Sequence, residues 1–128
     1  IDLDHFKSVN DTLGHAAGDR VLKTFGSILE QSLRVGDLAA RIGGDEFAVW
    51  LEETDLIGGR IAADRLLSHA PALRKAIGQD ECSLSLSIGG VLSVEADTLD
   101  ALKAVADKAL YQAKDNGKGC AVLMGEAL

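Results

Sequence analysis

Residues 41–47 read Arg-Ile-Gly-Gly-Asp-Glu-Phe, which sets two glycines and two acidic residues between apolar runs. Gly43 and Gly44 are a tight-turn signal, so the segment is predicted to form a β-hairpin. Because a glycine turn has no side chains, a bulky anion can approach its backbone, and Asp45 and Glu46 place carboxylates beside that opening. An anion and carboxylates are compatible when a cation lies between them. The hairpin therefore predicts a metal–phosphate site.

The composition indicates one globular domain that is long enough to bury a hydrophobic core. The chain has 128 residues, of which 47% are hydrophobic and 26% are charged. Its formal charge of −7 leaves no basic stripe for nucleic-acid phosphates, so nucleic acid is not an expected partner. An acidic protein can still bind nucleotides where divalent ions bridge its carboxylates to the phosphates.

The sequence carries few signals of cellular location. No apolar run approaches the roughly 20 residues of a membrane-spanning helix, and no secretory signal is present. Cys82 and Cys120 have no metal-ligand spacing and are expected to be reduced, small, buried side chains. We therefore expect a cytoplasmic domain. Since the chain begins abruptly at Ile1, we expect a fragment of a longer protein, and membrane anchoring of that parent stays open.

Hydrophobic periodicity gives the elements of the first half. Ile1 and Leu3 alternate with Asp2 and Asp4, as at the end of a strand whose apolar residues face away from the acids. We predict a strand at residues 1–3, a helix-compatible stretch at 4–14 that is broken at 10–11, a helix from about 19 to 34, and hairpin strands at 38–42 and 47–51.

The second half is predicted to contain two amphipathic helices and two strands. The helix near residues 55–68 has a predicted inward face of Leu56, Ile57, Ile61, Leu66 and Leu67. Loops are predicted at Pro71 and at 78–81, followed by an alternating strand at 83–88. Thr98 is predicted to cap a last helix that ends near Asn116, before a strand at 120–124. The inward residues predicted for that helix are Leu99, Leu102, Val105, Ala106, Leu110 and Ala113.

This element order predicts an α+β (mixed α/β) fold for residues 1–128 as a single domain. We expect a central, mostly antiparallel sheet flanked by helices. A βαββαβ palm-like core, of the nucleotidyl cyclase or ferredoxin-like kind, fits the order best.

Two further segments accompany the hairpin: residues 2–11, Asp-Leu-Asp-His-Phe-Lys-Ser-Val-Asn-Asp, and residues 111–114, Tyr-Gln-Ala-Lys. With these segments in family order and spacing, essentially the whole chain closely resembles the GGDEF domain family. The resemblance implies a bacterial diguanylate cyclase, which joins two GTP molecules into cyclic di-GMP with loss of two pyrophosphates. We expect the family's N-terminal part, a short helix and the beginning of the first strand, to be missing by truncation.

The resemblance also implies a metal site. Asp2 and Asp45 can meet only if their strands are neighbours, and the family implies that they are, with both carboxylates and the Leu3 carbonyl on two Mg²⁺ ions, or Mn²⁺ in their place. Two ions would stabilise the attacking and leaving oxygens at the α-phosphorus. Asp45 is commonly given the role of base for the 3′-hydroxyl, and Glu46 is the adjacent candidate. The alternative is that the acids are solvated turn carboxylates.

Phosphate recognition is assigned to backbone amides and two lysines. Gly43 and Gly44 are expected to offer unhindered N–H groups to the phosphates. By resemblance Lys114 reaches the triphosphate, and Lys118 stands where the family usually has arginine, which keeps the charge but loses the bidentate fork. The alternative for both is a pair of lysines that fringe a helix C-terminus.

Guanine recognition is assigned by resemblance to Asn10 and Asp19. Guanine presents an N1–H and an amine side by side, which one carboxylate can accept together, so Asp19 predicts GTP over ATP. The alternatives are Asn10 as a turn former and Asp19 as a helix N-cap. His15 matches a substrate-contacting position, with plain loop packing as the alternative. Phe6 is expected in the core.

A second site is implied at Arg34 and Asp37, an R-x-x-D in which the family binds inhibitory cyclic di-GMP, with Arg65 as its auxiliary arginine. Asp37 lies six residues before Gly43, about 20 Å along a strand, so feedback has to act between separate sites. The alternative is a surface ion pair.

Since one domain supplies one metal site and the product joins two GTPs, the active form is expected to be a homodimer. A second hypothesis is a non-catalytic module that senses GTP or cyclic di-GMP, and a third is an ATP-using cyclase or polymerase palm. Sensor or phosphodiesterase domains in the parent chain are compatible with the first two.

Overall fold

The computed structural model describes residues 1–94 and 97–125. Along the chain the elements are β1 (Asp2–Asp4), α1 (Phe6–Leu13), α2 (His15–Ser32), β2 (Leu38–Arg41), β3 (Phe47–Trp50), α3 (Leu56–Leu67), α4 (Ala70–Ala76), β4 (Ser85–Val91), α5 (Leu99–Asp115) and β5 (Ala121–Met124). The predicted α+β class is confirmed.

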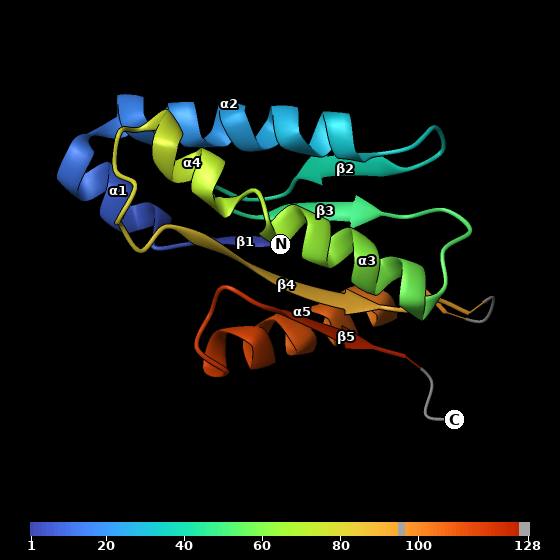
Figure 1. The fold of residues 1–128 in the computed structure, drawn as a ribbon. Helices are drawn as coiled ribbons and strands as arrows, with labels where there is room; N and C mark the ends of the chain where they lie inside the picture. Colours follow the sequence, from blue (N-terminus) through green and yellow to red (C-terminus); the bar gives the residue numbers. More distant parts are fainter. Residues whose placement is uncertain (95–96, 126–128) are drawn as a thin grey trace.

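The strands line up in the order β2-β3-β1-β4-β5. β2 pairs antiparallel with β3, β1 antiparallel with β4, and β4 parallel with β5. The two groups join where β1 meets the hairpin: Asp2 and Glu46 form an isolated antiparallel bridge, and the Leu3 N–H donates to the Asp45 carbonyl at 3.0 Å. The sheet is therefore mostly antiparallel, and the first strand lies beside the hairpin (Figure 1).

Alternation along β1 and β4 separates an apolar face of the sheet from a polar one. Leu3 lies opposite Leu86, and both belong to the main core. Asp4 lies opposite Ser85 and accepts a hydrogen bond from its hydroxyl at 2.7 Å. The strand pattern predicted for the first residues is confirmed. The core also contains Phe6, Val9, Val21, Phe25, Phe47, Leu66, Leu73, Leu84 and Ile88.

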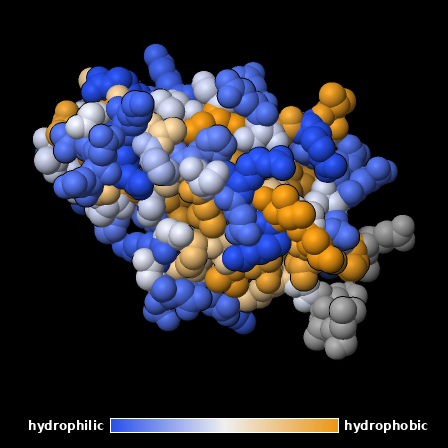
Figure 2. All heavy atoms as spheres, in the orientation of Figure 1, coloured by the Kyte–Doolittle hydropathy of each residue, from blue (hydrophilic) through white to orange (hydrophobic). Residues whose placement is uncertain are grey.

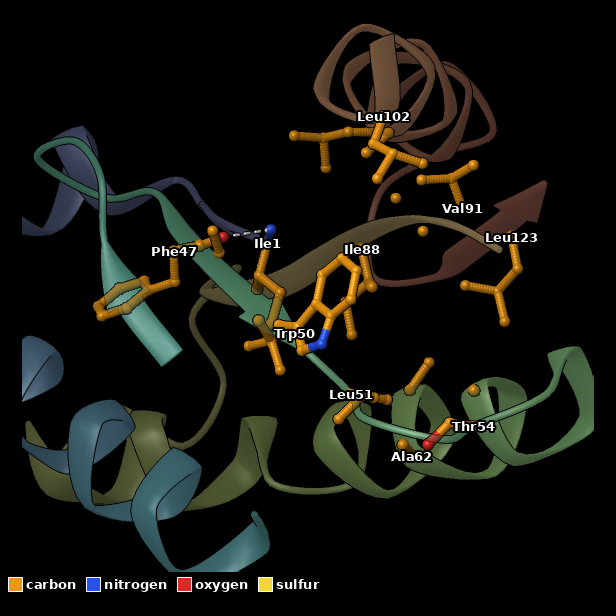
Figure 3. Close-up of a pocket in the computed structure, with 18 of the residues that line it drawn as sticks. Ile1, Phe47, Trp50, Leu51, Thr54, Ala62, Ile88, Val91, Leu102 and Leu123 are labelled. Atoms are coloured by element: carbon orange, nitrogen blue, oxygen red, sulfur yellow. Dashed lines mark hydrogen bonds between the residues drawn. The ribbon is translucent and has the colours of Figure 1, made fainter. Parts of the chain in front are cut away.

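Helices cover both faces of the sheet. α5 contacts β4 and β5 from one side and α3 contacts them from the other, as Figure 3 shows, while α2 packs on α1 and α4. Small residues let α5 approach closely, because Ala109 and Ala113 are fully buried. The predicted inward face of α5 is wrong at two residues, because Leu99 is 76% exposed and Val105 is 37% exposed. In the part of the chain that the structure describes, none of the helices is long and apolar enough to cross a membrane.

The first two helices differ from their predicted bounds. α1 continues through Asn10 and Asp11 instead of breaking there, and α2 begins at His15 rather than near Asp19. The interruption lies at Gly14, whose φ of 89° ends α1 and immediately precedes α2. A glycine adopts this left-handed conformation without steric cost. The turn formers inside α1 are tolerated because a packed helix overrides their weak local preference.

α4 was not expected, since Pro71 indicates a loop when it is taken as a helix breaker. Here Pro71 lies in the first turn of α4, where a missing N–H removes no intrahelical hydrogen bond. Leu73 on the same helix is fully buried. The proline therefore marks the start of a helix.

The predicted inward face of α3 is also partly wrong. Leu56, Ile57 and Ile61 are 40%, 72% and 55% exposed, whereas Ala63 and Leu66 are buried. Figure 2 shows hydrophobic side chains exposed over α3. The buried stripe combines a small and a large residue at helical spacing, so the largest apolar residues do not identify it.

Gly89 of β4 provides a test of the α5 packing. A Cβ there would lie 2.2 Å from the Leu110 nitrogen and 2.4 Å from the Ala106 carbonyl oxygen, both in the helix backbone. We predict that Gly89→Ala lowers the free energy of unfolding by about 1–3 kcal/mol, because α5 must move off the sheet. The measurement is urea unfolding followed by circular dichroism.

Gly26→Ala on α2 is the matched control, since an added Cβ there meets nothing within 4 Å. Its stability should be unchanged or raised by up to about 1 kcal/mol. Equal stability of the two variants would contradict the close approach of α5.

Candidate functional site

Two carboxylates and one lysine meet where β1, the hairpin turn and α5 come together. Asp45 lies beside β1 because its carbonyl accepts the Leu3 N–H at 3.0 Å. The ammonium group of Lys114, in the last turn of α5, forms an ion pair with Asp2. The structure thus brings together Asp2, Asp45 and Lys114, which the sequence analysis assigned to the metal and the triphosphate.

The electrostatics of this cluster show an excess of negative charge. Burial raises the pKa of the Asp45 carboxyl, and the charge of Asp2 adds to the effect. Burial alone would lower the pKa of Lys114, but the hydrogen bond and charge of Asp2, with the charges of Asp4 and Asp45, outweigh it and raise that pKa. Both directions are expected where carboxylates outnumber cations in a partly buried site.

The donor set fits a divalent cation. Asp2 Oδ1 is buried and has no hydrogen-bond partner among the described residues. Hard cations take such oxygens, and Mg²⁺ commonly uses one or two carboxylates together with water and substrate phosphates. Within residues 1–94 and 97–125 no three His, Cys, Asp or Glu side chains form a metal-binding group. The carboxylates of Asp2 and Asp45 therefore suit a cation shared with a phosphate, not a closed protein cage.

The glycine turn is held from one side and open on the other. Arg41 Nε donates to the Gly43 carbonyl at 3.0 Å, and Arg41 Nη2 donates to the Gly44 carbonyl at 2.8 Å. Of the two amides expected to face phosphate, that of Gly43 donates to the Glu46 carbonyl at 3.3 Å within the turn. A Cβ at Gly44 would meet nothing within 4 Å, so a ligand has room there. Sequence reasoning missed Arg41, whose only signal is its place two residues before the glycines.

The residues assigned to guanine lie on the α1–α2 pair. Asn10 is half-buried in α1, and a Cβ at Gly18 would lie 1.9 Å from Asn10 Oδ1. Asp19 follows Gly18 and is exposed inside α2, so the N-cap alternative is wrong, as is the turn-former alternative for Asn10. His15 is exposed as the first residue of α2, and Phe6 is 8% exposed in the core, as predicted.

Lys118 lies in the turn that follows α5. It is exposed, has a left-handed φ of 66°, and its N–H donates to the Ala113 carbonyl at 3.1 Å. In the described part of the chain, no hydrogen bond joins Lys118, Asn10 or Asp19 to the carboxylate cluster. These residues could act together only through a ligand that spans them.

Arg34 and Asp37 form a compact turn at the opposite end of the hairpin from Gly43. The Asp37 carboxylate accepts the N–H groups of Arg34 and Glu52, each at 2.9 Å. Arg34 Nη2 donates to the Glu52 carbonyl at 3.0 Å and to Thr54 Oγ1 at 2.8 Å, while its side chain is 64% exposed. The alternative of a surface ion pair is only part of this wider network, because Arg34 Nε lies 3.5 Å from Asp37 Oδ2.

These backbone hydrogen bonds, first that of Arg34 and then that of Glu52, lower the pKa of the Asp37 carboxyl from its ordinary 3.8. Because the folded value is lowered, the stabilisation is complete above pH 3.8 and is lost as the pH falls through the lowered value. Arg65 is exposed on α3, and the described residues show no hydrogen bond from it to Arg34 or Asp37.

A mostly apolar cavity of about 440 Å³ lies away from the carboxylates. It lies between β3 and β4, with α3 on one side and α5 on the other (Figure 3). Its lining is mostly apolar and includes Trp50, Ile88, Leu102 and Leu123, with Glu46 among the few acids. An apolar cavity disfavours a triphosphate, so we assign the nucleotide to the open side of the glycine turn.

Comparison with known proteins agrees with this geometry. A family model described as "Diguanylate cyclase, GGDEF domain" matches residues 1–120. The probable diguanylate cyclase DgcT of Escherichia coli K12 is 40% identical over 129 residues, which cover 96% of this chain. The chain spans only 28% of the length of that relative.

Two solved structures share the fold. Diguanylate cyclase SiaD of Pseudomonas aeruginosa, in complex with its activator SiaC, has a TM-score of 0.86 at 35% identity, over 96% of this chain and 47% of that one. The GGDEF domain of DgcB from Caulobacter crescentus, in complex with c-di-GMP, has a TM-score of 0.84 at 26% identity, over 97% and 73% of the two chains. Sequence motif, strand order and family model thus agree, and the chain belongs to the GGDEF domain family.

Proposed function

We propose that this domain is a diguanylate cyclase: with a divalent cation it binds GTP and, facing a second copy of itself, forms cyclic di-GMP and pyrophosphate. The observation that carries the proposal is the meeting of Asp2 and Asp45 beside the open turn at Gly44, where a buried oxygen of Asp2 has no hydrogen-bond partner among residues 1–94 and 97–125. Membership of the GGDEF family supports the guanine nucleotide as substrate.

The chain's own groups would bind and orient the triphosphate. When bound, magnesium (two ions, or manganese in their place) would supply charge neutralisation at the attacking and leaving oxygens of the α-phosphate. Asp2, Asp45 and the Leu3 carbonyl would hold it. Lys114, paired with Asp2 here, would turn to the phosphates once another cation neutralises Asp2. The room beside Gly44 admits phosphate oxygens to the turn.

Asp45 is the better candidate than Glu46 for accepting the proton of the attacking 3′-hydroxyl. Its carboxyl lies near enough to Asp2 and Lys114 for their charges to act on it, so it belongs to the cluster at which the phosphates would bind. Glu46 instead lines the apolar cavity. Asn10 and Asp19, on touching helices, would read the guanine edge, with the exposed carboxylate of Asp19 accepting the N1–H and the amine.

GTP turnover tests this function. We predict that the protein incubated with GTP and Mg²⁺ releases cyclic di-GMP, and that Asp45→Ala lowers the rate at least about 100-fold because both a cation ligand and the base are lost. Chromatographic separation of the nucleotides measures the product. Glu30→Gln, at an exposed position on α2, is the control and should keep the wild-type rate.

Since each chain supplies one half of the site, product per chain should rise with protein concentration. A flat rate across a dilution series that dissociates dimers would exclude the two-copy mechanism. GTP or cyclic di-GMP binding without any turnover would instead favour a non-catalytic sensing module.

Gly18 tests guanine recognition separately from folding. We predict that Gly18→Ala raises the KM for GTP at least about tenfold, because the new Cβ displaces the Asn10 side chain that lies 1.9 Å away. Gly26→Ala on the same helix is the matched control, with open space around its Cβ. Steady-state kinetics give the comparison, and a KM equal to that of the control would remove Asn10 from the base pocket.

The Arg34–Asp37 turn is the proposed binding site for the product. The DgcB structure contains c-di-GMP, and the Arg34 side chain, 64% exposed here, would present its guanidinium to a phosphate. We propose that Arg65 joins it once product is bound, and that occupancy acts on the placement of the two copies. An activator protein, as in the SiaD complex, or attached sensor and phosphodiesterase domains would also act on the placement of the two copies.

We predict that Arg34→Ala weakens cyclic di-GMP binding at least about tenfold, because a charged hydrogen-bond donor to phosphate is lost. Isothermal titration calorimetry measures the affinity, with initial GTP turnover in product-free solution as the check on folding. Undiminished binding in the variant would show that the turn is only a structural network.

A further inference from the structure

Asp4 is a buried carboxylate that the mechanism above does not use. It is 2% exposed and lies on β1, on the polar face of the sheet. Ser85 Oγ donates to Asp4 Oδ2 at 2.7 Å, and Ser87 Oγ lies 2.7 Å and 2.9 Å from the two carboxylate oxygens. The Gly119 N–H donates to Asp4 Oδ2 at 3.1 Å. A buried carboxylate is costly unless donors surround it in this way, and an apolar residue would hold two strands together equally well.

The hydrogen bond to Gly119 links β1 to a turn of unusual conformation. Gly117, Lys118 and Gly119 all have positive φ, at 112°, 66° and 61°. For Lys118 this left-handed conformation is unfavourable, because its Cβ crowds the backbone. Such a conformation persists only where the surroundings determine it. Here the Lys118 N–H is held by the Ala113 carbonyl on one side, and the next amide is held by Asp4 on the other.

This arrangement ties a basic residue to the strand that carries the carboxylates. Asp4 follows Asp2 by two residues on the same face of β1, so the turn that it holds is joined to the strand two residues from Asp2. Lys118 is exposed and has no side-chain hydrogen bond among the described residues. Its side chain is therefore free for a ligand, while its backbone is fixed.

We propose that Asp4 is a positioning residue for phosphate: through Gly119 it fixes the left-handed backbone of Lys118, so that the ammonium of Lys118 faces the triphosphate bound at Asp2 and Asp45. The inference rests on the proposed function, since it concerns the phosphate end of the same site. Asp4 itself contacts neither the cation nor the nucleotide. The Asp4 side chain acts as a strut between the first strand and the turn that follows α5.

The test is Asp4→Asn, which keeps the shape of the side chain and removes its charge. Binding of inorganic tripolyphosphate with Mg²⁺, measured by calorimetry, should weaken about tenfold, while binding of guanosine changes less than about twofold. A general loss of structure would weaken both ligands alike. Unchanged tripolyphosphate binding by folded Asp4→Asn would overturn the proposal.

A double-mutant cycle with Lys118→Met tests the route of the effect. If Asp4 acts through Lys118, the double variant binds tripolyphosphate no more than about threefold more weakly than Lys118→Met alone. Fully additive losses would overturn the proposal. Should Asp4→Asn not fold, Ser87→Ala is the second variant, because it removes the donor that reaches both oxygens. It should give a smaller loss in the same direction, and no loss would overturn the proposal.

GTP turnover by the wild-type protein separates this inference from the proposed function. Turnover together with unchanged tripolyphosphate binding in Asp4→Asn would overturn the role of Asp4 alone. Absence of turnover with a tenfold loss of tripolyphosphate binding would overturn the cyclase and support the role of Asp4. A wild-type protein that binds no tripolyphosphate with Mg²⁺ would overturn both.

Discussion

The fold holds two carboxylates together against their mutual repulsion, and the candidate site depends on this constraint. Asp2 and Asp45 come from segments more than forty residues apart and meet because backbone hydrogen bonds join β1 to the hairpin turn. The energy of that pairing comes from the sheet and its core. Lys114 balances the charges only partly, and burial together with the charge of Asp2 raises the pKa of Asp45. The divalent cation of the proposed function would relieve the remaining imbalance.

The polar face of β1 and β4 also holds a buried acid, Asp4, that needs hydrogen-bond donors around it. Period-two alternation puts Leu3 and Leu86 into the core and leaves Asp4, Ser85 and Ser87 on the face that α5 covers. Burying an acid there would be unfavourable without the two hydroxyls and an amide that donate to it. The same strand thus carries the acidic side chains on its polar face and contributes Leu3 to the core on the other.

Local pattern in the sequence was enough for most of the fold, because strand alternation and glycine turns are properties of neighbouring residues. It failed where tertiary packing decides. Pro71 is compatible with both a loop and a first helical turn, and only the buried Leu73 distinguishes them. Ile57 and Ile61 are large and apolar, yet the stripe of α3 that meets the sheet contains a small residue instead. The size and hydropathy of side chains do not identify a helix face that packs closely against the sheet.

The candidate site likewise contains residues that the sequence predicted and residues that it did not. Asp45 was predicted from its place beside the glycine turn together with the family resemblance, and Lys114 from the resemblance alone. Residues that hold other residues in place have no such pattern: Arg41 binds two carbonyls of the glycine turn, and Asp4 binds an amide more than a hundred positions away. Their partners are backbone atoms, which every residue has, so no side-chain pattern records the pairing. Only the three-dimensional structure identifies them.

The hairpin separates the proposed substrate site from the proposed product site, so GTP and cyclic di-GMP need not compete for one site. Gly44 and Asp45 lie in its turn, whereas Asp37 lies before β2 at the other end, with β2 and β3 pairing between them. A product bound at Asp37 cannot reach the carboxylate cluster directly, so any inhibition has to pass through rigid displacement of the domain or of a second copy. A stiff two-stranded hairpin can carry a displacement from one site to the other. A direct electrostatic effect between the sites is weaker, because solvent screens charges at such separations. Under the proposed function, feedback from the Arg34–Asp37 turn would therefore act on the geometry of two facing copies.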